Sequence, residues 1–138
     1  MMIYFNAIQG ASLIATHGVA TKLLLSLTLR VYQFLEPDPK RRQTIENNPH
    51  VQRFQAAQRN ESEYLGILVA LLLFYSTSSS VDVSLASTLA VVGQIGYVWT
   101  RTLFGYPKIP AIVMAVTRYS ALVLLCLPLY QSAFVQAQ

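Results

Sequence analysis

Apolar residues fall into four long blocks that are separated by short polar segments. The blocks span residues 3–34, 51–76, 83–104 and 110–134, and the second starts polar before becoming apolar from about Gly66. Each is close to the roughly 20 residues that a helix needs to cross a hydrocarbon core of about 30 Å. Strands would leave backbone groups unpaired in lipid. The pattern therefore predicts an all-α membrane protein, a bundle of four transmembrane helices in a single domain, 1–138.

Composition supports a chain whose surface faces lipid. Hydrophobic residues make up 54% and charged residues 12% of the sequence, too few charges for the polar shell of a soluble domain of this size. The N-terminus lacks the basic flank and cleavage site of a signal peptide, so we expect it to stay as the first span. The single cysteine, Cys126, excludes an intrachain disulfide. No zinc-ligand or redox spacing is present, and we expect no metal site.

The distribution of basic residues predicts how the helices are oriented in the membrane. Six of them crowd the first connection and its flanks: Arg30, Lys40, Arg41, Arg42, Arg53 and Arg59. Arg101 and Lys108 flank the third connection, whereas the second, residues 76–82, has no basic residue. Since basic loops stay on the cytoplasmic side, loops 36–50 and 105–109 are expected there, with both termini on the opposite side.

The loops and small residues predict how the spans pack. Proline, charge and amide side chains in residues 36–50 predict an irregular surface segment rather than another element. Gly105 and Pro110 predict a tight helical hairpin, and Pro128 should kink the last span. Ala7, Ala11, Ala15 and Gly18 form a small-residue strip for close helix contact. A chain this small is expected to complete its packing by oligomerising.

The polar start of the second block is the best candidate for chemistry. At about 100° per residue, Arg53, Ala57, Asn60 and Tyr64 share one narrow stripe of a helix, with Ala56 and Glu63 beside it. Ionisable groups at membrane depth mark functional sites by default. The alternative is that the charged residues of this segment snorkel to headgroups or pair along the helix; these residues are Arg53, Arg59, Glu61 and Glu63.

Residues 53–64, Arg-Phe-Gln-Ala-Ala-Gln-Arg-Asn-Glu-Ser-Glu-Tyr, resemble the second-helix signature of the membrane-associated proteins in eicosanoid and glutathione metabolism. This family holds microsomal glutathione transferases, leukotriene-C synthase and the lipoxygenase-activating protein. The residues that match in register are Arg53, Ala57, Gln58, Asn60, Glu63 and Tyr64. The short length, the four predicted spans and the basic first loop agree with the family, so the resemblance covers nearly the whole chain in layout.

The resemblance implies a homotrimer that binds glutathione as co-substrate between neighbouring subunits near the cytoplasmic side, while a lipophilic substrate arrives from the membrane lipids. Asn60, Glu63 and Tyr64 would hold the tripeptide from one subunit, and Gln58 and Arg30 would approach from the adjacent one. Arg53 occupies the position of the family's first arginine, where it would either touch ligand or serve the structure. Glutathione's two carboxylates and ammonium need guanidinium and carboxylate partners.

The chain departs from the family pattern at two places. Ala56 stands where many glutathione-using members have a second arginine, and the start of the fourth span, residues 110–114, lacks the arginine that stabilises the thiolate in the leukotriene-C synthase branch. Arg101 is our candidate for that catalytic role, and Arg118 is the other possible substitute, with an interior structural role as its alternative. Lys22 and His17 are interpreted as a snorkelling lysine and a packed histidine.

Three hypotheses follow for the function. The first is a glutathione-dependent transferase or peroxidase acting on hydrophobic electrophiles or lipid hydroperoxides. The second is a non-catalytic lipid-binding or scaffold protein of the same fold, which Ala56 and the missing arginine favour. The third is a small structural subunit of a larger membrane complex. The basic first loop is explained by membrane topology, and we expect no nucleic-acid partner.

Overall fold

The computed structural model describes residues 4–78 and 81–134, without the side chains of residues 30, 33, 78 and 132–134. The described residues form five helices: α1 (Ala7–Leu35), α2 (Pro39–Glu46), α3 (Pro49–Ser78), α4 (Ser84–Phe104) and α5 (Ile109–Phe134). α1, α3, α4 and α5 cover the four predicted blocks, and none of the described residues forms a strand. The all-α prediction is confirmed.

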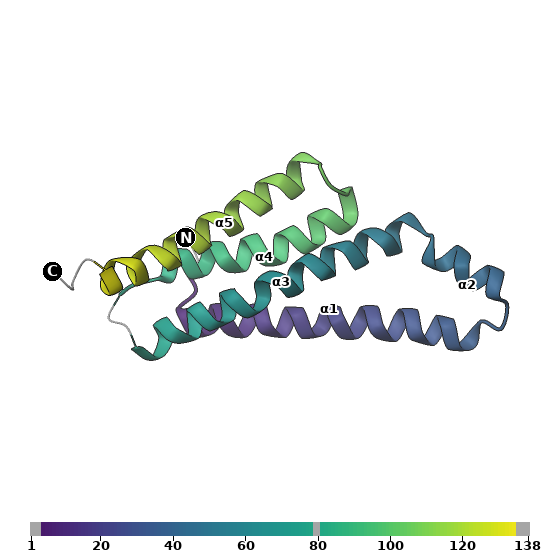
Figure 1. Ribbon diagram of the computed structural model, residues 1–138, viewed down its shortest axis with the longest axis horizontal. Coiled ribbons are helices and arrows are strands. Elements are labelled where there is room, and N and C mark those ends of the chain that lie inside the picture. The colour runs from purple at the N-terminus through teal and green to yellow at the C-terminus, as the bar shows by residue number, and fades with distance from the viewer. Residues whose placement is uncertain (1–3, 79–80, 135–138) are drawn as a thin grey trace.

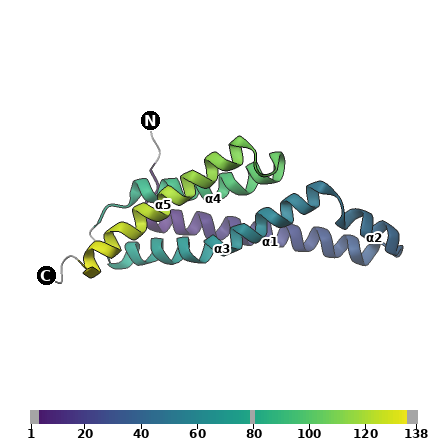
Figure 2. The same cartoon turned by 45° about the horizontal axis from the view of Figure 1, so that its top comes forward.

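The long helices are arranged as two antiparallel hairpins that pack against each other. α1 pairs with α3 and α4 pairs with α5, while α3 and α1 both contact α4 (Figure 1). α1 and α3 extend past the α4–α5 hairpin and carry α2 at their far end (Figures 1 and 2). The α1–α3 and α4–α5 connections therefore point toward the same end of the molecule, and the first described residues lie toward the other.

The prediction of an irregular first loop was wrong, because residues 39–46 form α2. The Asp38 side chain accepts a hydrogen bond from the Lys40 backbone N–H at 3.0 Å, and Pro39 occupies the first turn. A capping aspartate followed by proline at the start is a strong local signal for a helix. α2 buries no residue. The polar composition therefore predicted the surface position correctly, and only the predicted backbone conformation was wrong.

Helix ends follow the local sequence. Asn6 and Gln9 form a capping box at the start of α1, which begins four residues after the predicted start of the first block at Ile3, a residue outside those described. Gly105 ends α4 with a φ of 81°, and Pro110 lies in the first turn of α5. The predicted hairpin between the last two helices is confirmed.

Small residues bring the helices together, as the sequence predicted for α1. Ala7, Ala11 and Gly18 are buried. Among the described glycines, the closest approach to the backbone of another helix is between α4 and α5: a Cβ added to Gly93 would lie 2.5 Å from the Arg118 backbone nitrogen. Glycine at position 93 thus allows α5 to pass directly over α4 where Arg118 enters the bundle.

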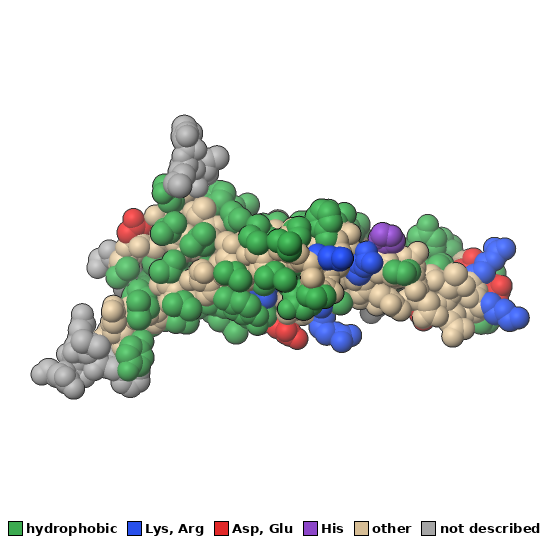
Figure 3. Space-filling view, turned by 90° about the horizontal axis from the view of Figure 1, so that it is seen from above, with side chains coloured by type: hydrophobic (Ala, Val, Ile, Leu, Met, Phe, Trp, Pro, Cys, Tyr) green, Lys and Arg blue, Asp and Glu red, His purple; other side chains and the backbone are tan. Residues whose placement is uncertain are grey.

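Two of the described helices have the length and composition of membrane spans. These segments are Ala7–Leu29 in α1 and Ile109–Gln131 in α5. In the space-filling view, hydrophobic side chains cover much of the visible face, while most of the visible Lys and Arg side chains lie from the middle of the molecule toward α2 (Figure 3). On this face, apolar side chains therefore dominate, and most of the charged side chains lie from the middle toward α2 (Figure 3).

Candidate functional site

A buried arginine lies at the centre of the bundle. Arg118 of α5 is only 1% exposed. Its Nη1 donates to Asn60 Oδ1 of α3 at 2.9 Å and contacts Gln94 Oε1 of α4 at 3.4 Å. Three helices therefore meet at one guanidinium, and both acceptors are side-chain amides rather than carboxylates.

Tyrosine rings surround this guanidinium. Its central carbon lies 3.8 Å from the centroid of the Tyr64 ring, 4.5 Å from that of Tyr97 and 5.3 Å from that of Tyr119. The hydroxyls of Tyr64 and Tyr119 are 3.0 Å apart. Aromatic faces stabilise a cation that has lost its water. The Arg118 Nε is buried and has no hydrogen-bond partner among the described residues.

A buried carboxylate lies one helical position from Asn60. Glu61 is 1% exposed, and its two oxygens lie 2.7 Å from His17 Nδ1 and from the Thr21 hydroxyl. Trp99 Nε1, which can only donate, lies 3.0 Å from His17 Nε2. His17 therefore accepts at Nε2 and, as a neutral imidazole, carries its proton on Nδ1 and donates it to Glu61.

Gln94 connects the arginine and the carboxylate. Its Nε2 donates to the Glu61 backbone carbonyl at 3.1 Å, while its Oε1 faces Arg118. The side chain is completely buried. We call the connected group the interior polar network; its members are His17, Thr21, Asn60, Glu61, Gln94, Trp99 and Arg118.

A pocket of about 630 Å³ lies on the α1 side of α3. Its described lining combines an arginine, a glutamate, two glutamines, a serine and a leucine: Leu25, Gln55, Gln58, Arg59, Ser62 and Glu63. Glu63 was predicted to bind glutathione from one subunit and Gln58 from the adjacent subunit, whereas in this single chain both side chains line the same pocket. We call this pocket the α1–α3 pocket. It presents both signs of charge.

A second pocket, of about 280 Å³, lies between the start of α3 and the end of α4. It is lined by Pro49, Gln52, Arg53, Ala56, Arg101 and Tyr106, and we call it the α3–α4 pocket. The Arg101 guanidinium donates from Nη1 to the Tyr97 hydroxyl at 2.8 Å and lies 5.8 Å from the centroid of the Tyr106 ring. The two charged residues that line the α3–α4 pocket are Arg53 and Arg101, and both were predicted site residues.

A third polar opening reaches the buried carboxylate. A small pocket of about 120 Å³ is lined by Gly18, Val19, Lys22, Glu61, Ser62 and Leu65. Ser62 also lines the α1–α3 pocket, so the two openings are neighbours along α3. Lys22 is exposed, while the buried Glu61 also lines this pocket.

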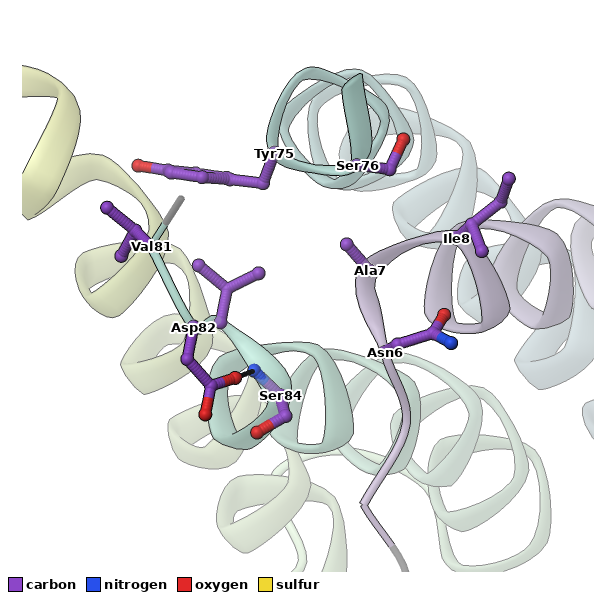
Figure 4. Close-up of a pocket in the computed structure, with 9 residues that line it drawn as sticks. Asn6, Ala7, Ile8, Tyr75, Ser76, Val81, Asp82 and Ser84 are labelled. Carbon is purple, nitrogen blue, oxygen red and sulfur yellow. Dashed lines mark hydrogen bonds between the residues drawn. The ribbon is translucent and has the colours of Figure 1, made fainter. Parts of the chain in front are cut away.

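The opposite end of the bundle has a pocket without predicted site residues. It measures about 350 Å³ and lies where the start of α1, the end of α3 and the start of α4 meet (Figure 4). Asp82 accepts from the Ser84 backbone N–H at 2.9 Å (Figure 4), and this bond holds the pKa of the Asp82 carboxyl below its ordinary value. The polar side chains of this pocket bond the helix starts: Asn6 caps α1, and Asp82 bonds the first residue of α4.

The predicted site residues separate into three places. Gln58 and Glu63 line the α1–α3 pocket, Arg53 and Arg101 line the α3–α4 pocket, and Asn60 and Tyr64 contact Arg118 inside the bundle. The Arg30 side chain lies outside the described residues. One helix, α3, thus contributes residues to all three groups, and Arg101 comes from α4.

Sequence reasoning missed most of the interior polar network. Glu61 was placed at the membrane interface only in the alternative interpretation of this segment, and the structure buries it. His17 is packed, as predicted, but it is also hydrogen-bonded to that carboxylate. The available signal was the spacing of Ala57, Glu61, Tyr64 and Leu68 by four, three and four residues, which places them on one face of α3. For Arg118, the sequence left two alternatives open, a catalytic substitute and an interior structural role.

Comparison with known families gives one match. The model of the MAPEG family matches residues 7–130, a range that contains the interior polar network, the α1–α3 pocket and the α3–α4 pocket. Comparisons with curated proteins and with solved structures gave no match.

Proposed function

Since the chain belongs to the MAPEG family, we propose that it is a membrane-bound, glutathione-dependent transferase or peroxidase acting on hydrophobic electrophiles or lipid hydroperoxides. The observation that carries this proposal is the α1–α3 pocket, where Gln58 and Glu63 lie beside Arg59. Such a combination of charges suits a small zwitterion better than a purely apolar ligand. The family is associated with glutathione generally.

Glutathione fits the chemistry of this pocket. Its ammonium would pair with the Glu63 carboxylate, and one of its carboxylates with the Arg59 guanidinium, which presents a fork of donors. The Gln58 amide would bond a peptide group. At about 630 Å³, the pocket falls within the usual size range of small-molecule sites.

We propose that neighbouring subunits complete the site in a homotrimer. Glu63 and Arg59 are exposed in the single chain, and a second copy would shield them from water and so strengthen their pairing with a ligand. Arg30, in the last turns of α1, is proposed to approach from that copy. All four long helices, with 29, 30, 21 and 26 residues, exceed the about 20 residues of a span, and we propose that all four cross the membrane. In this arrangement loops 36–50 and 105–109 are cytoplasmic.

Asn60 and Tyr64 serve the site through Arg118 in this proposal. Their polar and aromatic groups are directed at that guanidinium within the subunit. They therefore stabilise the position of α3 and do not bind the tripeptide itself. This assigns them a positioning role in place of the direct contact that the resemblance implied.

The reactive group would be the thiolate of bound glutathione. Arg101 lies in the α3–α4 pocket and not in the α1–α3 pocket of the same chain. It is therefore proposed to favour the thiolate over the thiol from a neighbouring subunit of the homotrimer, because a permanent cation stabilises a nearby anion. The thiolate sulfur would form a bond to an electrophilic carbon of the lipophilic substrate, whose leaving group or added proton balances the charge. With a hydroperoxide, two glutathione molecules would supply the two electrons that convert the peroxide to an alcohol and water, leaving glutathione disulfide.

Calorimetric titration of the detergent-purified protein with glutathione tests the proposal. We expect saturable binding in the millimolar range or tighter, and a melting temperature that rises with glutathione concentration. Glu63→Ala should abolish both effects, whereas Glu36→Ala, which removes a carboxylate at the end of α1, should leave them intact. Absence of heat and of a thermal shift at millimolar glutathione would overturn the proposal.

A non-catalytic lipid-binding or scaffold role is the second candidate. It is supported by Ala56, which supplies no cation, and by the engagement of Arg118 with amides and tyrosine rings inside the bundle. A turnover assay with a general electrophile separates the candidates, because a scaffold should bind lipid without forming a glutathione adduct. Stable co-purification with other chains would indicate the third candidate, a subunit of a larger complex.

A further inference from the structure

The buried Glu61 carboxylate contacts a hydroxyl that has more acceptors than protons. Glu61 Oε2 lies 2.7 Å from the hydroxyl oxygen of Thr21, which is itself buried. The same hydroxyl oxygen lies 3.1 Å from the backbone carbonyl oxygens of both His17 and Gly18. A hydroxyl carries one proton, so Thr21 can make a full bond to only one of these three acceptors at a time.

Both protonation states of Glu61 find hydrogen-bond partners in this arrangement. When the carboxylate is ionised, Thr21 donates to Oε2. When Oε2 carries a proton, Glu61 donates to the Thr21 oxygen, and Thr21 donates to one of the two carbonyl oxygens of α1, as threonine often does within a helix. The same atoms therefore serve the carboxylate and the carboxylic acid, and neither state leaves a buried polar group without a partner.

We propose that Glu61 is a reversible proton-binding site inside the bundle, and that it takes up the proton that the glutathione thiol loses on becoming a thiolate. As the acceptor of the thiol proton, Glu61 depends on the proposed function. As a proton-binding site, it can be measured separately and without glutathione.

His17, the titratable group in contact with Glu61, has no free position for a second proton. The Trp99 Nε1–H can only donate, and it lies 3.0 Å from His17 Nε2, so that nitrogen presents its lone pair. The proton of the ring therefore lies on Nδ1, which is 2.7 Å from Glu61 Oε1. A proton that enters this part of the network thus finds its place on Glu61 Oε2 and not on the imidazole.

The other charged groups around Glu61 do not pair with it. Lys22 of α1 lines the small pocket beside it, and α4 presents the uncharged Gln94, which bonds the Glu61 backbone carbonyl. The Arg118 guanidinium of α5 lies beyond Gln94, 3.4 Å from its Oε1. Among the described residues, the one ion pair of Glu61 is with His17. A change in the charge of Glu61 therefore breaks no bond to a permanently charged side chain.

A short route joins Glu61 to the α1–α3 pocket, where glutathione is proposed to bind. The small pocket of about 120 Å³ is lined by Glu61 and Ser62, and Ser62 also lines the α1–α3 pocket. This volume exceeds the about 30 Å³ that a water molecule occupies in the liquid, and its polar lining supplies partners that such a water needs. A proton released in the α1–α3 pocket can therefore reach Glu61 by exchange along water and the Ser62 hydroxyl.

The proton transfer balances without a further reactant. The S–H bond of glutathione breaks, and its electron pair stays on sulfur as the thiolate. An O–H bond forms at Glu61 Oε2, so the negative charge passes from the carboxylate to the sulfur and the total charge is unchanged. After the sulfur has bonded to the electrophile, Glu61 returns the proton to the leaving group or to the product.

Infrared difference spectroscopy of the full-length protein in detergent micelles tests the proton-binding site directly. We expect acidification to produce, reversibly, the carbonyl band of a buried carboxylic acid in the wild type. Glu61→Gln keeps the size of the side chain but cannot take up the proton, and it should lack the band. Glu46→Gln, which removes an exposed carboxylate of α2, should keep it. Absence of a Glu61-dependent band over the pH range in which the protein stays folded would overturn the proposal.

Substitutions at Thr21 test the exchange of donor and acceptor while leaving Glu61 in place. In Thr21→Val the Glu61 O–H has no hydroxyl oxygen to donate to, so its carbonyl band should move to a higher frequency. Thr21→Ser retains the hydroxyl and should leave the band at the wild-type position. A band that stays unmoved in Thr21→Val would contradict the bond from which the proposal is argued.

Proton release on binding glutathione separates this inference from the proposed function. In weakly buffered solution, the thiolate is followed by its ultraviolet absorbance and the released protons by an indicator dye. The wild type should release fewer than one proton for each thiolate formed, whereas Glu61→Gln should release a full proton. If the wild type also releases a full proton, Glu61 is not the acceptor of the thiol proton. If no protein binds glutathione and the Glu61-dependent band remains, the proposed function fails and the proton-binding site stands.

Discussion

The Arg118 guanidinium of α5 donates a 2.9 Å hydrogen bond to the Asn60 side chain of α3. This bond joins the last helix to the helix that carries the candidate site residues 53–64. The bond is formed within a ring of three tyrosines. A cation in this position therefore ties the α4–α5 hairpin to α3.

Replacing the buried arginine should destabilise the bundle. Arg118→Met removes the donor to Asn60 and leaves the amide oxygens of Asn60 and Gln94 without their partner, at a cost of roughly 1 to 3 kcal/mol in the free energy of unfolding. Unfolding monitored in mixed detergent measures the change. Arg41→Met, on an exposed helix, is the control and should alter stability by less than about 0.5 kcal/mol. Equal stability of the two variants would contradict a structural role for Arg118.

Neutralising the buried carboxylate should also weaken the fold. Glu61→Gln replaces one acceptor oxygen by an N–H₂ group, which would face either the His17 Nδ1–H or the Thr21 hydroxyl. We expect a loss of about 1 to 3 kcal/mol in the free energy of unfolding, measured as above. Ser62→Ala, the neighbouring change on an exposed side chain, should be nearly neutral. A Glu61→Gln protein as stable as the wild type would show that the second acceptor oxygen is not needed in this position.

Two glycines offer a matched test of helix contact. A methyl group at Gly93 would meet the Arg118 backbone, whereas one at Gly66 would meet nothing within 4 Å. Gly93→Ala should therefore cost about 1 to 3 kcal/mol through overpacking, while Gly66→Ala should be neutral or stabilise the helix by up to about 1 kcal/mol. Thermal unfolding in detergent compares them, and the reverse order would contradict the close approach of α4 and α5.

Trimer formation is checked by native mass spectrometry of the protein released from micelles. Three copies of the 15.4 kDa chain should appear as one assembly at concentrations where glutathione binds. Glutathione should increase the trimer fraction if neighbouring subunits share the ligand, by simple mass action. A monomer that binds glutathione with full affinity would show that the α1–α3 pocket needs no second copy.

The sequence predicted the helices well because block length and apolar content are local properties. Gly105, Pro110 and the small residues of α1 lie where those signals placed them. α2 was not predicted, because its capping aspartate and first-turn proline were interpreted only as loop residues. The N-cap Asp38 and Pro39 at the start of this segment favour a helical backbone there.

The site was predicted only in part because the sequence does not show which face of α3 meets which neighbour. Asn60 and Tyr64 share a face, as periodicity indicated, yet that face meets Arg118 from a helix more than 50 residues away. Glu61 and Glu63 are two positions apart and look alike in sequence. A rotation of about 200° along the helix buries the first and exposes the second.

The hydrogen bond between Trp99 and His17 has a practical consequence, since the chain contains a single tryptophan. Fluorescence excited at wavelengths that tyrosine does not absorb therefore originates from one indole, which is attached to the interior polar network and stacked on Phe54. Any event that shifts α1 against α4 changes the surroundings of that indole. The protein carries its own optical reporter of the relative placement of its two hairpins, with no dye or added label.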